Sequence, residues 1–157
     1  MDTVDLLNYH SWADKMIVGC LKQVSDDDFT SSSKDVRSIR ELVNHYISGY
    51  DYLGYSSDQL AEREEKLSAM NPEEVLKEIS KSHQKFREKA LKFDQVMTMK
   101  VGNNIPVKLD KDNYLLVFLD HMTYHRGQII HAVKSRGYKG VNTDYYDYQQ
   151  DLALNKT

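Results

Sequence analysis

The segment from Asp112 to Gly137 reads DNYLLVFLDHMTYHRGQIIHAVKSRG and predicts a long helix. Its apolar residues recur at helical spacing, with polar and charged residues between them. Gly137 supplies a C-terminal stop, and the basic residues Lys134 and Arg136 precede it, where the helix dipole favours positive charge. Because an amphipathic helix must bury its apolar face against another element, this segment favours a helical bundle.

Three earlier segments carry the same periodicity. The first runs from about Val4 to Val24. The second begins with the capping box Ser38-Ile39-Arg40-Glu41 and is expected to reach about Leu60 or somewhat beyond. The third opens with Asn71-Pro72-Glu73-Glu74, where an amide cap, a proline and two carboxylates favour a helix start, and it continues through Leu91. With the segment at the C-terminal side, these make four amphipathic helices.

Two other segments complete the expected fold. Between Val96 and Leu109 the period changes to two around Gly102-Asn103-Asn104, which predicts a short β-hairpin or an extended excursion. The Tyr-rich tail Asp144–Tyr148 is expected to pack back onto the bundle as a short turn or helix. We therefore predict an all-α four-helix bundle, in a single domain over residues 1–157, with the short excursion before the last helix.

Composition limits the classes of function. The 21 Lys and Arg residues are dispersed among 24 Asp and Glu residues, so no basic stripe indicates nucleic-acid binding. An acidic start and the lack of a long apolar run predict neither a signal peptide nor a membrane anchor. Cys20 is the single cysteine; it excludes an internal disulfide, lies on an apolar stripe as an expected core residue, and is compatible with a cytoplasmic location.

A pair of histidines carries the strongest chemical signal. His121 and His125 are four residues apart, so their imidazoles project from one helix face and can reach one ion. The same face carries Val117, Phe118 and Ala132, and we therefore expect the pair to lie against the bundle interior.

A metal ion needs a third donor, and His45 is the best candidate for it. His45 shares its helix side with Leu42 and Gly49. Three neutral histidines would leave coordination positions open, which is typical of catalytic rather than structural metal sites. Gly49 and Gly127 lie inside helical segments, where close packing beside the site would offset their low helix propensity. Three core histidines bonded to neighbours would give the same pattern, so a plain bundle stays an alternative.

Other metal sites do not fit the sequence. Met122 follows His121 where a zinc protease of the His-Glu-x-x-His type needs glutamate. The Glu-x-x-His pairs of di-iron bundles are absent, and Glu41 is explained as part of a helix cap. Neither a zincin nor a dinuclear carboxylate site is expected.

The residues around the pair have less specific roles. Tyr124 and Gln128 lie within a turn of it and either orient substrate or simply pack and bond between helices. Arg126 falls on the far side of the helix, where we expect a structural ion pair. Three further histidines are expected to be exposed and outside the site: His10, His83 and His131.

Several motifs together resemble the DinB family of metal-dependent bundle proteins, also called DinB/YfiT-like. The most specific is His-x-x-x-His-Arg-Gly-Gln-Ile over His121–Ile129, followed by a glycine and by the tail Thr143–Tyr148. Tyr9–Asp14 is similar to the family's Tyr-x-x-Trp-Ala-Asn, with Asp14 in place of Asn. Ser38–His45 is similar to the segment in which the family places its first metal ligand. Prolines often found before the tail are absent.

The resemblance implies both a topology and a site. It implies an up-down-down-up bundle in which His45, His121 and His125 hold a divalent metal ion, with zinc, nickel or iron foremost among the metals that imidazole suits. It further implies a metal-dependent transferase or hydrolase that acts on a small molecule, with a low-molecular-weight thiol as cosubstrate, and a homodimer. A non-catalytic stress-response protein or ligand carrier is the alternative.

Overall fold

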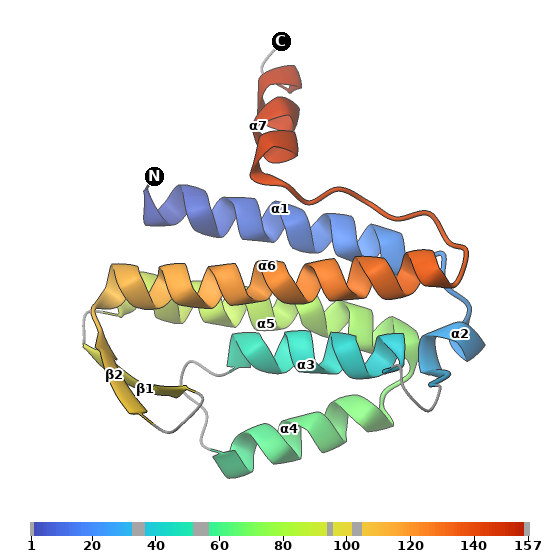
Figure 1. Ribbon diagram of the computed structural model, residues 1–157, viewed down its shortest axis with the longest axis horizontal. Coiled ribbons are helices and arrows are strands. Elements are labelled where there is room, and N and C mark those ends of the chain that lie inside the picture. The colour runs from blue at the N-terminus through green and yellow to red at the C-terminus, as the bar shows by residue number, and fades with distance from the viewer. Residues whose placement is uncertain (1, 33–36, 52–56, 94–95, 102–104, 156–157) are drawn as a thin grey trace.

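The chain folds into an all-α structure with one small hairpin (Figure 1). The computed structural model describes residues 2–32, 37–51, 57–93, 96–101 and 105–155. Within these residues lie seven helices and two strands: α1 (Thr3–Leu21), α2 (Asp26–Thr30), α3 (Ile39–Asp51), α4 (Ser57–Ala69), α5 (Pro72–Lys92), β1 (Met97–Val101), β2 (Ile105–Leu109), α6 (Lys111–Ser135) and α7 (Tyr145–Leu154). The predicted fold class is confirmed, with more helices than the four expected.

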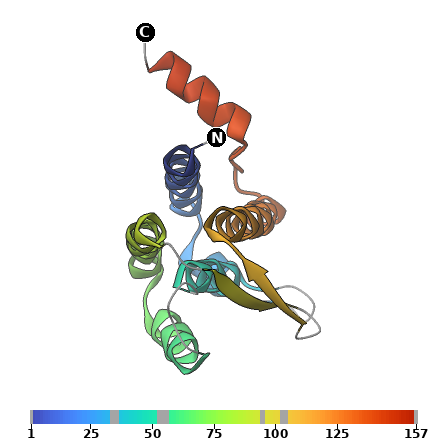
Figure 2. The ribbon, with the colours of Figure 1, turned by 90° about the vertical axis from the view of Figure 1, so that its left-hand side faces the viewer.

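Four of the helices enclose the core. α1 and α3 each contact both α5 and α6, so the four axes form a ring when seen end on (Figure 2). One residue from each helix shows the depth of this core, because all four are 0% exposed: Ile17, Ile47, Ile79 and Val133. Since α3 and α6 are neighbours in the ring, side chains from their outer flanks can meet.

Two of these helices start at the predicted capping boxes. At α3 the Glu41 backbone N–H donates to Ser38 Oγ at 3.1 Å, and the Ser38 N–H donates to Glu41 Oε2 at 2.7 Å. At α5 the Glu74 N–H donates to Asn71 Oδ1 at 3.0 Å, and the Asn71 N–H donates to Glu74 Oε2 at 2.9 Å. Each box satisfies two backbone donors that a helix start leaves free, which fixes where the helix begins.

The prediction of one helix from Ser38 to about Leu60 is wrong. α3 ends at Asp51, and a separate helix, α4, begins at Ser57 and lies beside α3 (Figure 1). Arg63 holds α4 in place, since its Nε donates to Asp51 at 2.8 Å and its Nη2 donates to Glu78 at 2.7 Å. Among the α4 residues whose burial is described, 58–69, only Leu67 is buried, so α4 lacks the apolar stripe that would have marked it as a separate helix in the sequence.

The excursion before α6 is a hairpin, as predicted. β1 and β2 pair antiparallel, with Met97 opposite Leu109 and Val101 opposite Ile105. The predicted turn at Gly102–Asn104 lies outside the described residues. α6 starts one residue before the predicted Asp112, and Gly137 follows its end with a φ of 85°, a left-handed conformation that glycine adopts readily.

The Tyr-rich tail forms helix α7, which was predicted as a short turn or helix. It lies against α1, where Trp12 Nε1 donates to Asp151 Oδ2 at 2.9 Å and the Tyr148 ring packs on Tyr9 and Trp12. Beyond this contact α7 projects from the body (Figure 1). None of the described helices has both the length and the apolar character needed to cross a lipid bilayer.

Candidate metal centre

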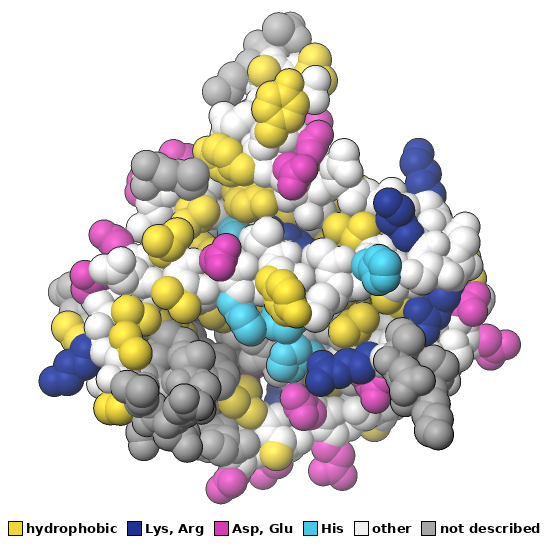
Figure 3. Space-filling model, in the orientation of Figure 1, with side chains coloured by type: hydrophobic (Ala, Val, Ile, Leu, Met, Phe, Trp, Pro, Cys, Tyr) yellow, Lys and Arg dark blue, Asp and Glu magenta, His cyan; other side chains and the backbone are white. Residues whose placement is uncertain are grey.

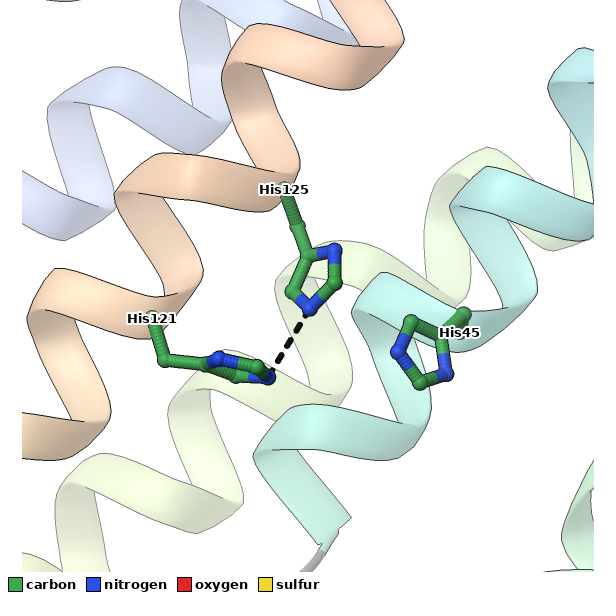
Figure 4. A group of neighbouring side chains, drawn as sticks. All are labelled: His45, His121 and His125. Carbon is green, nitrogen blue, oxygen red and sulfur yellow. Dashed lines mark hydrogen bonds between the residues drawn. The ribbon is translucent and has the colours of Figure 1, made fainter. Parts of the chain in front are cut away.

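Helix α6 presents two imidazoles to one point. His121 and His125 lie one turn apart, and their Nε2 atoms are 2.8 Å from each other (Figure 4). Their rings are nearly perpendicular, with centroids 4.3 Å apart. Since two nitrogens bound to one tetrahedral ion at about 2.0 Å would be about 3.3 Å apart, the pair is already close to the spacing that a shared metal ion requires.

Helix α3 contributes the third imidazole. His45 lies across from His125, with ring centroids 4.6 Å apart and planes at 87° (Figure 4). Each of the three histidines offers one ring nitrogen such that all three nitrogens lie within 4.8 Å of one another. Small side-chain rotations would bring them onto one ion. Three imidazoles are a donor set suited to zinc, nickel or iron, so these residues fit a divalent metal ion.

The cluster opens onto the molecular surface. Figure 3 shows histidine side chains exposed in the middle of one face. His125 is 7% exposed, whereas His45 and His121 are exposed, and Val117 is 43% exposed. The expectation that the pair lies against the interior therefore holds only for His125. His121 and Val117 lie on the outer flank of α6, beside the buried stripe of that helix, which leaves the site accessible to a small molecule.

Hydrogen bonds on α6 orient His125. Gln128 Nε2 donates to the Tyr124 hydroxyl at 3.0 Å, which leaves Gln128 Oε1 to accept from His125 Nδ1 at 2.8 Å. With the proton on Nδ1, Nε2 of His125 keeps its lone pair and faces the other two histidines. These bonds lie within α6, so they are not the bonds between helices that the sequence left open for Tyr124 and Gln128. They orient a histidine, a role that the sequence analysis did not predict.

The electrostatic environment favours neutral ligands. Burial lowers the pKa of His45, and the nearby charge of Arg37 lowers it further. Burial also lowers the pKa of His125, by more than the hydrogen bond that His125 donates to Gln128 raises it. A histidine must be neutral to bind a metal ion, so both effects keep a lone pair available near neutral pH.

A cavity of about 310 Å³ lies beside His45, between α3 and α4. Its other lining residues are polar or charged: Arg37, Glu41, Asn44, Glu64 and Ser68. Sequence reasoning missed them as site residues. Arg37 directly precedes the predicted helix cap Ser38, so the sequence indicated that it lies at the start of a helix. It did not indicate which residues from other helices would lie beside it. Glu64 comes from α4, which was not recognised as a separate helix.

Two of the remaining histidines are buried, contrary to the prediction. His83 is 4% exposed and its Nδ1 lies 2.7 Å from Asp14 Oδ2, while His10 is 1% exposed and its Nδ1 lies 2.7 Å from Arg126 Nη1. Asp14 and Arg126 are buried charged partners, and they explain why polar rings are tolerated in the core. His131 is exposed, as predicted.

Arg126 lies on the far side of α6 from the clustered histidines, as predicted, but among the residues that the structure describes it has no ion pair, contrary to the prediction. It is 0% exposed, and its Nη2 donates to the Tyr9 hydroxyl at 3.0 Å and to Thr123 Oγ1 at 2.9 Å. The groups that accept its hydrogen bonds are thus uncharged hydroxyls and the His10 ring. The residue connects α6 to α1 behind the metal centre.

The predicted packing reason holds for one of the two glycines. A Cβ on Gly49 would lie 2.7 Å from Sδ of Met122, so this glycine lets α3 approach α6 next to the ligands. A Cβ on Gly127 would meet nothing within 4 Å outside its own helix turn, so the expectation of close packing there is wrong. The exposed position of Gly127 on α6 explains the open space.

Cys20 is a core residue, as predicted. It is 6% exposed, and its thiol donates to the Lys139 carbonyl at 3.4 Å. Burial raises the pKa of the thiol, which disfavours the reactive thiolate.

Comparisons with known proteins agree with the motifs. A model of the family described as "DinB family" matches residues 1–153. The chain is also similar to Protein DinB of Bacillus subtilis (strain 168), with 24% identity over 165 residues that cover 97% of this chain and 94% of the relative. The family match spans nearly the whole length and includes all three clustered histidines. The chain therefore belongs to the DinB family.

Proposed function

We propose that His45, His121 and His125 hold a divalent metal ion, and that the protein is a metal-dependent transferase or hydrolase of a small molecule. The observation that carries the proposal is the meeting of three ring nitrogens, from α3 and α6, within 4.8 Å on an open face. Zinc, nickel and iron suit the imidazole donors. Three protein ligands leave positions for substrate, so the site is of the catalytic type.

When bound, the ion would polarise a substrate oxygen or lower the pKa of a bound water or thiol. The chain's own residues contribute orientation and access. Gln128 holds the His125 ring with Nε2 toward the ion position. Tyr124 is 63% exposed, and its hydroxyl accepts a hydrogen bond from Gln128. The hydroxyl is therefore available to contact a substrate. A low-molecular-weight thiol is the cosubstrate that we propose.

We also infer the up-down-down-up order for the four core helices. The support is the closed ring of contacts among α1, α3, α5 and α6 together with the direction of the colour gradient along them in Figure 1. α1 and α6 run in one direction, and α3 and α5 run in the other. In this order the ligand-bearing helices α3 and α6 are antiparallel neighbours.

Metal analysis of purified, untagged protein tests the site. We expect about one divalent ion per chain in the wild type and strong loss of the ion in His45→Ala. Because His45 is exposed, the metal-free thermal stability of this variant should stay close to that of the wild type. His131→Ala is the matched control, since it removes an exposed histidine from the same protein without touching the cluster. Equal metal contents in all three proteins would contradict the proposal.

Turnover separates an enzyme from the alternative, a non-catalytic stress-response protein or ligand carrier. We expect metal-loaded protein to accelerate transfer of a small thiol to a bimane electrophile, or hydrolysis of a nitrophenyl ester. The His45→Ala variant should lose this acceleration. Metal binding without acceleration for any substrate of either type would favour the carrier.

A further inference from the structure

The cavity beside His45 offers more than space for a metal-bound water. Its volume of about 310 Å³ is at the lower end of the range of about 300–1,000 Å³ that small-molecule pockets occupy. Figure 3 shows a basic side chain and acidic side chains next to the exposed histidines on the same face. A ligand on the metal ion could therefore reach charged groups of both signs.

The charges in the cavity differ in their availability. Glu41 is occupied, because it accepts from the Ser38 backbone and hydroxyl in the helix cap. Within the described residues, neither Arg37 nor Glu64 has an ion pair or a side-chain hydrogen bond. Both line the same cavity as His45. The cavity thus presents one available guanidinium and one available carboxylate close to a metal ligand.

The Asn44 side chain supplies an observation that is independent of the two charges. Its side chain lines the cavity but is only 7% exposed, and Nδ2 donates to Ser68 Oγ at 3.3 Å. Within the described part of the chain, Oδ1 is buried without a hydrogen-bond partner. If the amide were placed the other way round, the nitrogen would be unpaired instead. Since buried amide groups are normally satisfied, one end of the Asn44 amide lacks a partner beside the cavity.

We propose that this cavity binds the α-amino-acid moiety of a zwitterionic substrate, with the carboxylate on Arg37, the ammonium on Glu64 and one further hydrogen bond to Asn44. The inference rests on the proposed metal site, which takes a donor atom from the side chain of the same substrate. A guanidinium is well suited to a carboxylate, and charge-assisted bonds are stronger than neutral ones. A ligand with only one of the two charges would leave the other protein group unpaired and thus bind less tightly.

Four small thiols separate the two contacts. L-cysteine carries both charges, cysteamine only the ammonium, mercaptopropionate only the carboxylate, and mercaptoethanol neither. Each would be titrated into cobalt-loaded protein, because the cobalt absorption spectrum reports both sulfur binding and any loss of the metal. We expect L-cysteine to bind about tenfold more tightly than cysteamine or mercaptopropionate.

Two variants assign the contacts. Arg37→Gln should reduce the affinity for L-cysteine to that for cysteamine and leave the affinity for cysteamine unchanged. Glu64→Gln should reduce the affinity for L-cysteine to the affinity for mercaptopropionate. The matched controls are Glu65→Gln, an exposed neighbour on α4, and Lys85→Gln, an exposed cation on α5. All four positions are exposed, so the variants should fold and load cobalt normally.

The outcomes distinguish this inference from the metal site on which it rests. Normal cobalt loading with equal affinity for the four thiols, or with wild-type preferences in both variants, would overturn the zwitterion pocket alone. Failure of the wild type to load cobalt would overturn the metal site and the pocket with it. The metal site and the pocket are both supported if the wild type prefers L-cysteine about tenfold and each variant loses the preference that depends on its own charged group.

Discussion

Gln128 Oε1 lies 2.8 Å from Nδ1 of His125, one turn along the same helix. The amide nitrogen of Gln128 donates to the Tyr124 hydroxyl, so the oxygen is left for the imidazole. This bond sets the tautomer of His125 and turns Nε2 toward His121 and His45. The motif from His121 to Gln128 therefore contains two of the three clustered histidines and the group that orients one of them.

Removal of this orienting bond should weaken metal binding. We expect Gln128→Ala to lower the affinity for zinc by about 10–100-fold, because the His125 ring would no longer be held in one tautomer and orientation. Competition with a chromophoric zinc chelator measures this affinity. Gln149→Ala is the control, since Gln149 is exposed on α7. An unchanged zinc affinity in Gln128→Ala would show that Gln128 does not orient the ligand.

The two helical glycines near the site should respond oppositely to alanine. Gly127→Ala should stabilise the protein by about 0.5–1 kcal/mol, because alanine has the higher helix propensity and its Cβ meets open space. Gly49→Ala should lose this gain, because its Cβ would lie 2.7 Å from Sδ of Met122, a side chain that is 0% exposed. Urea denaturation of the metal-free proteins measures both effects. A similar gain in the two variants would mean that Met122 moves aside freely.

Local signals in the sequence predicted the helix starts and the pairing of two histidines on one helix face. The capping boxes at Ser38 and Asn71 depend on residues three apart, so their chemistry is complete within one turn. The spacing of His121 and His125 likewise fixes their common face without reference to the rest of the fold. His45 lies on a second helix, and its position on the Gly49 side of α3 made it the best candidate for a third donor; the structure places it in the cluster.

Tertiary contacts were beyond these local signals. His83 lies among lysines in the sequence and was expected to be exposed, yet it is buried against Asp14 of α1, 69 positions away. The prediction merged α4 with α3, because the contacts that hold α4 as a separate helix are between helices. Arg63 of α4 bonds to Asp51 of α3 and to Glu78 of α5. The cavity residues Arg37 and Glu64 come from different elements for the same reason. Polar contacts between distant residues depend on the tertiary fold, and the hydrophobic periodicity of the sequence does not predict them.

Asp14, which stands where the family pattern has asparagine, should be needed for stability. Its carboxylate accepts from the hydroxyls of Tyr46 at 2.5 Å and Tyr50 at 2.9 Å, and it contacts His83. Burial and the Asp14 charge raise the pKa of both tyrosines, so their hydroxyls remain donors. Asp14→Asn replaces one acceptor oxygen by a donor nitrogen, and we expect a loss of about 1–3 kcal/mol in the free energy of unfolding.

Urea denaturation of Asp14→Asn measures this loss, with Asp5→Asn as the control on the exposed side of α1. The metal content should stay at the wild-type level, because Asp14 contacts none of the three ligands in the described structure. A variant as stable as the wild type would show that the buried donors find other acceptors.

The contact between Glu78 and Arg63 should make stability depend on pH. Burial alone would raise the pKa of Glu78, but hydrogen bonds from Lys81 and Arg63, each at 2.7 Å, bring it below its usual value. A carboxylate with a lowered folded pKa stabilises the fold above its unfolded pKa, and this contribution is lost as the pH falls through the folded pKa. At about pH 7 we expect Glu78→Gln to be about 1–3 kcal/mol less stable than the wild type.

The difference between wild type and Glu78→Gln should shrink once the pH falls below the unfolded glutamate value of about 4.3. Urea denaturation at a series of pH values measures it. Glu62→Gln, which changes an exposed carboxylate on α4, should show little difference at any pH. Arg63 connects α4 to both α3 and α5 through its ion pairs with Asp51 and Glu78. A stability difference for Glu78→Gln that does not change with pH would mean that the ionised Glu78 carboxylate does not contribute to this anchor.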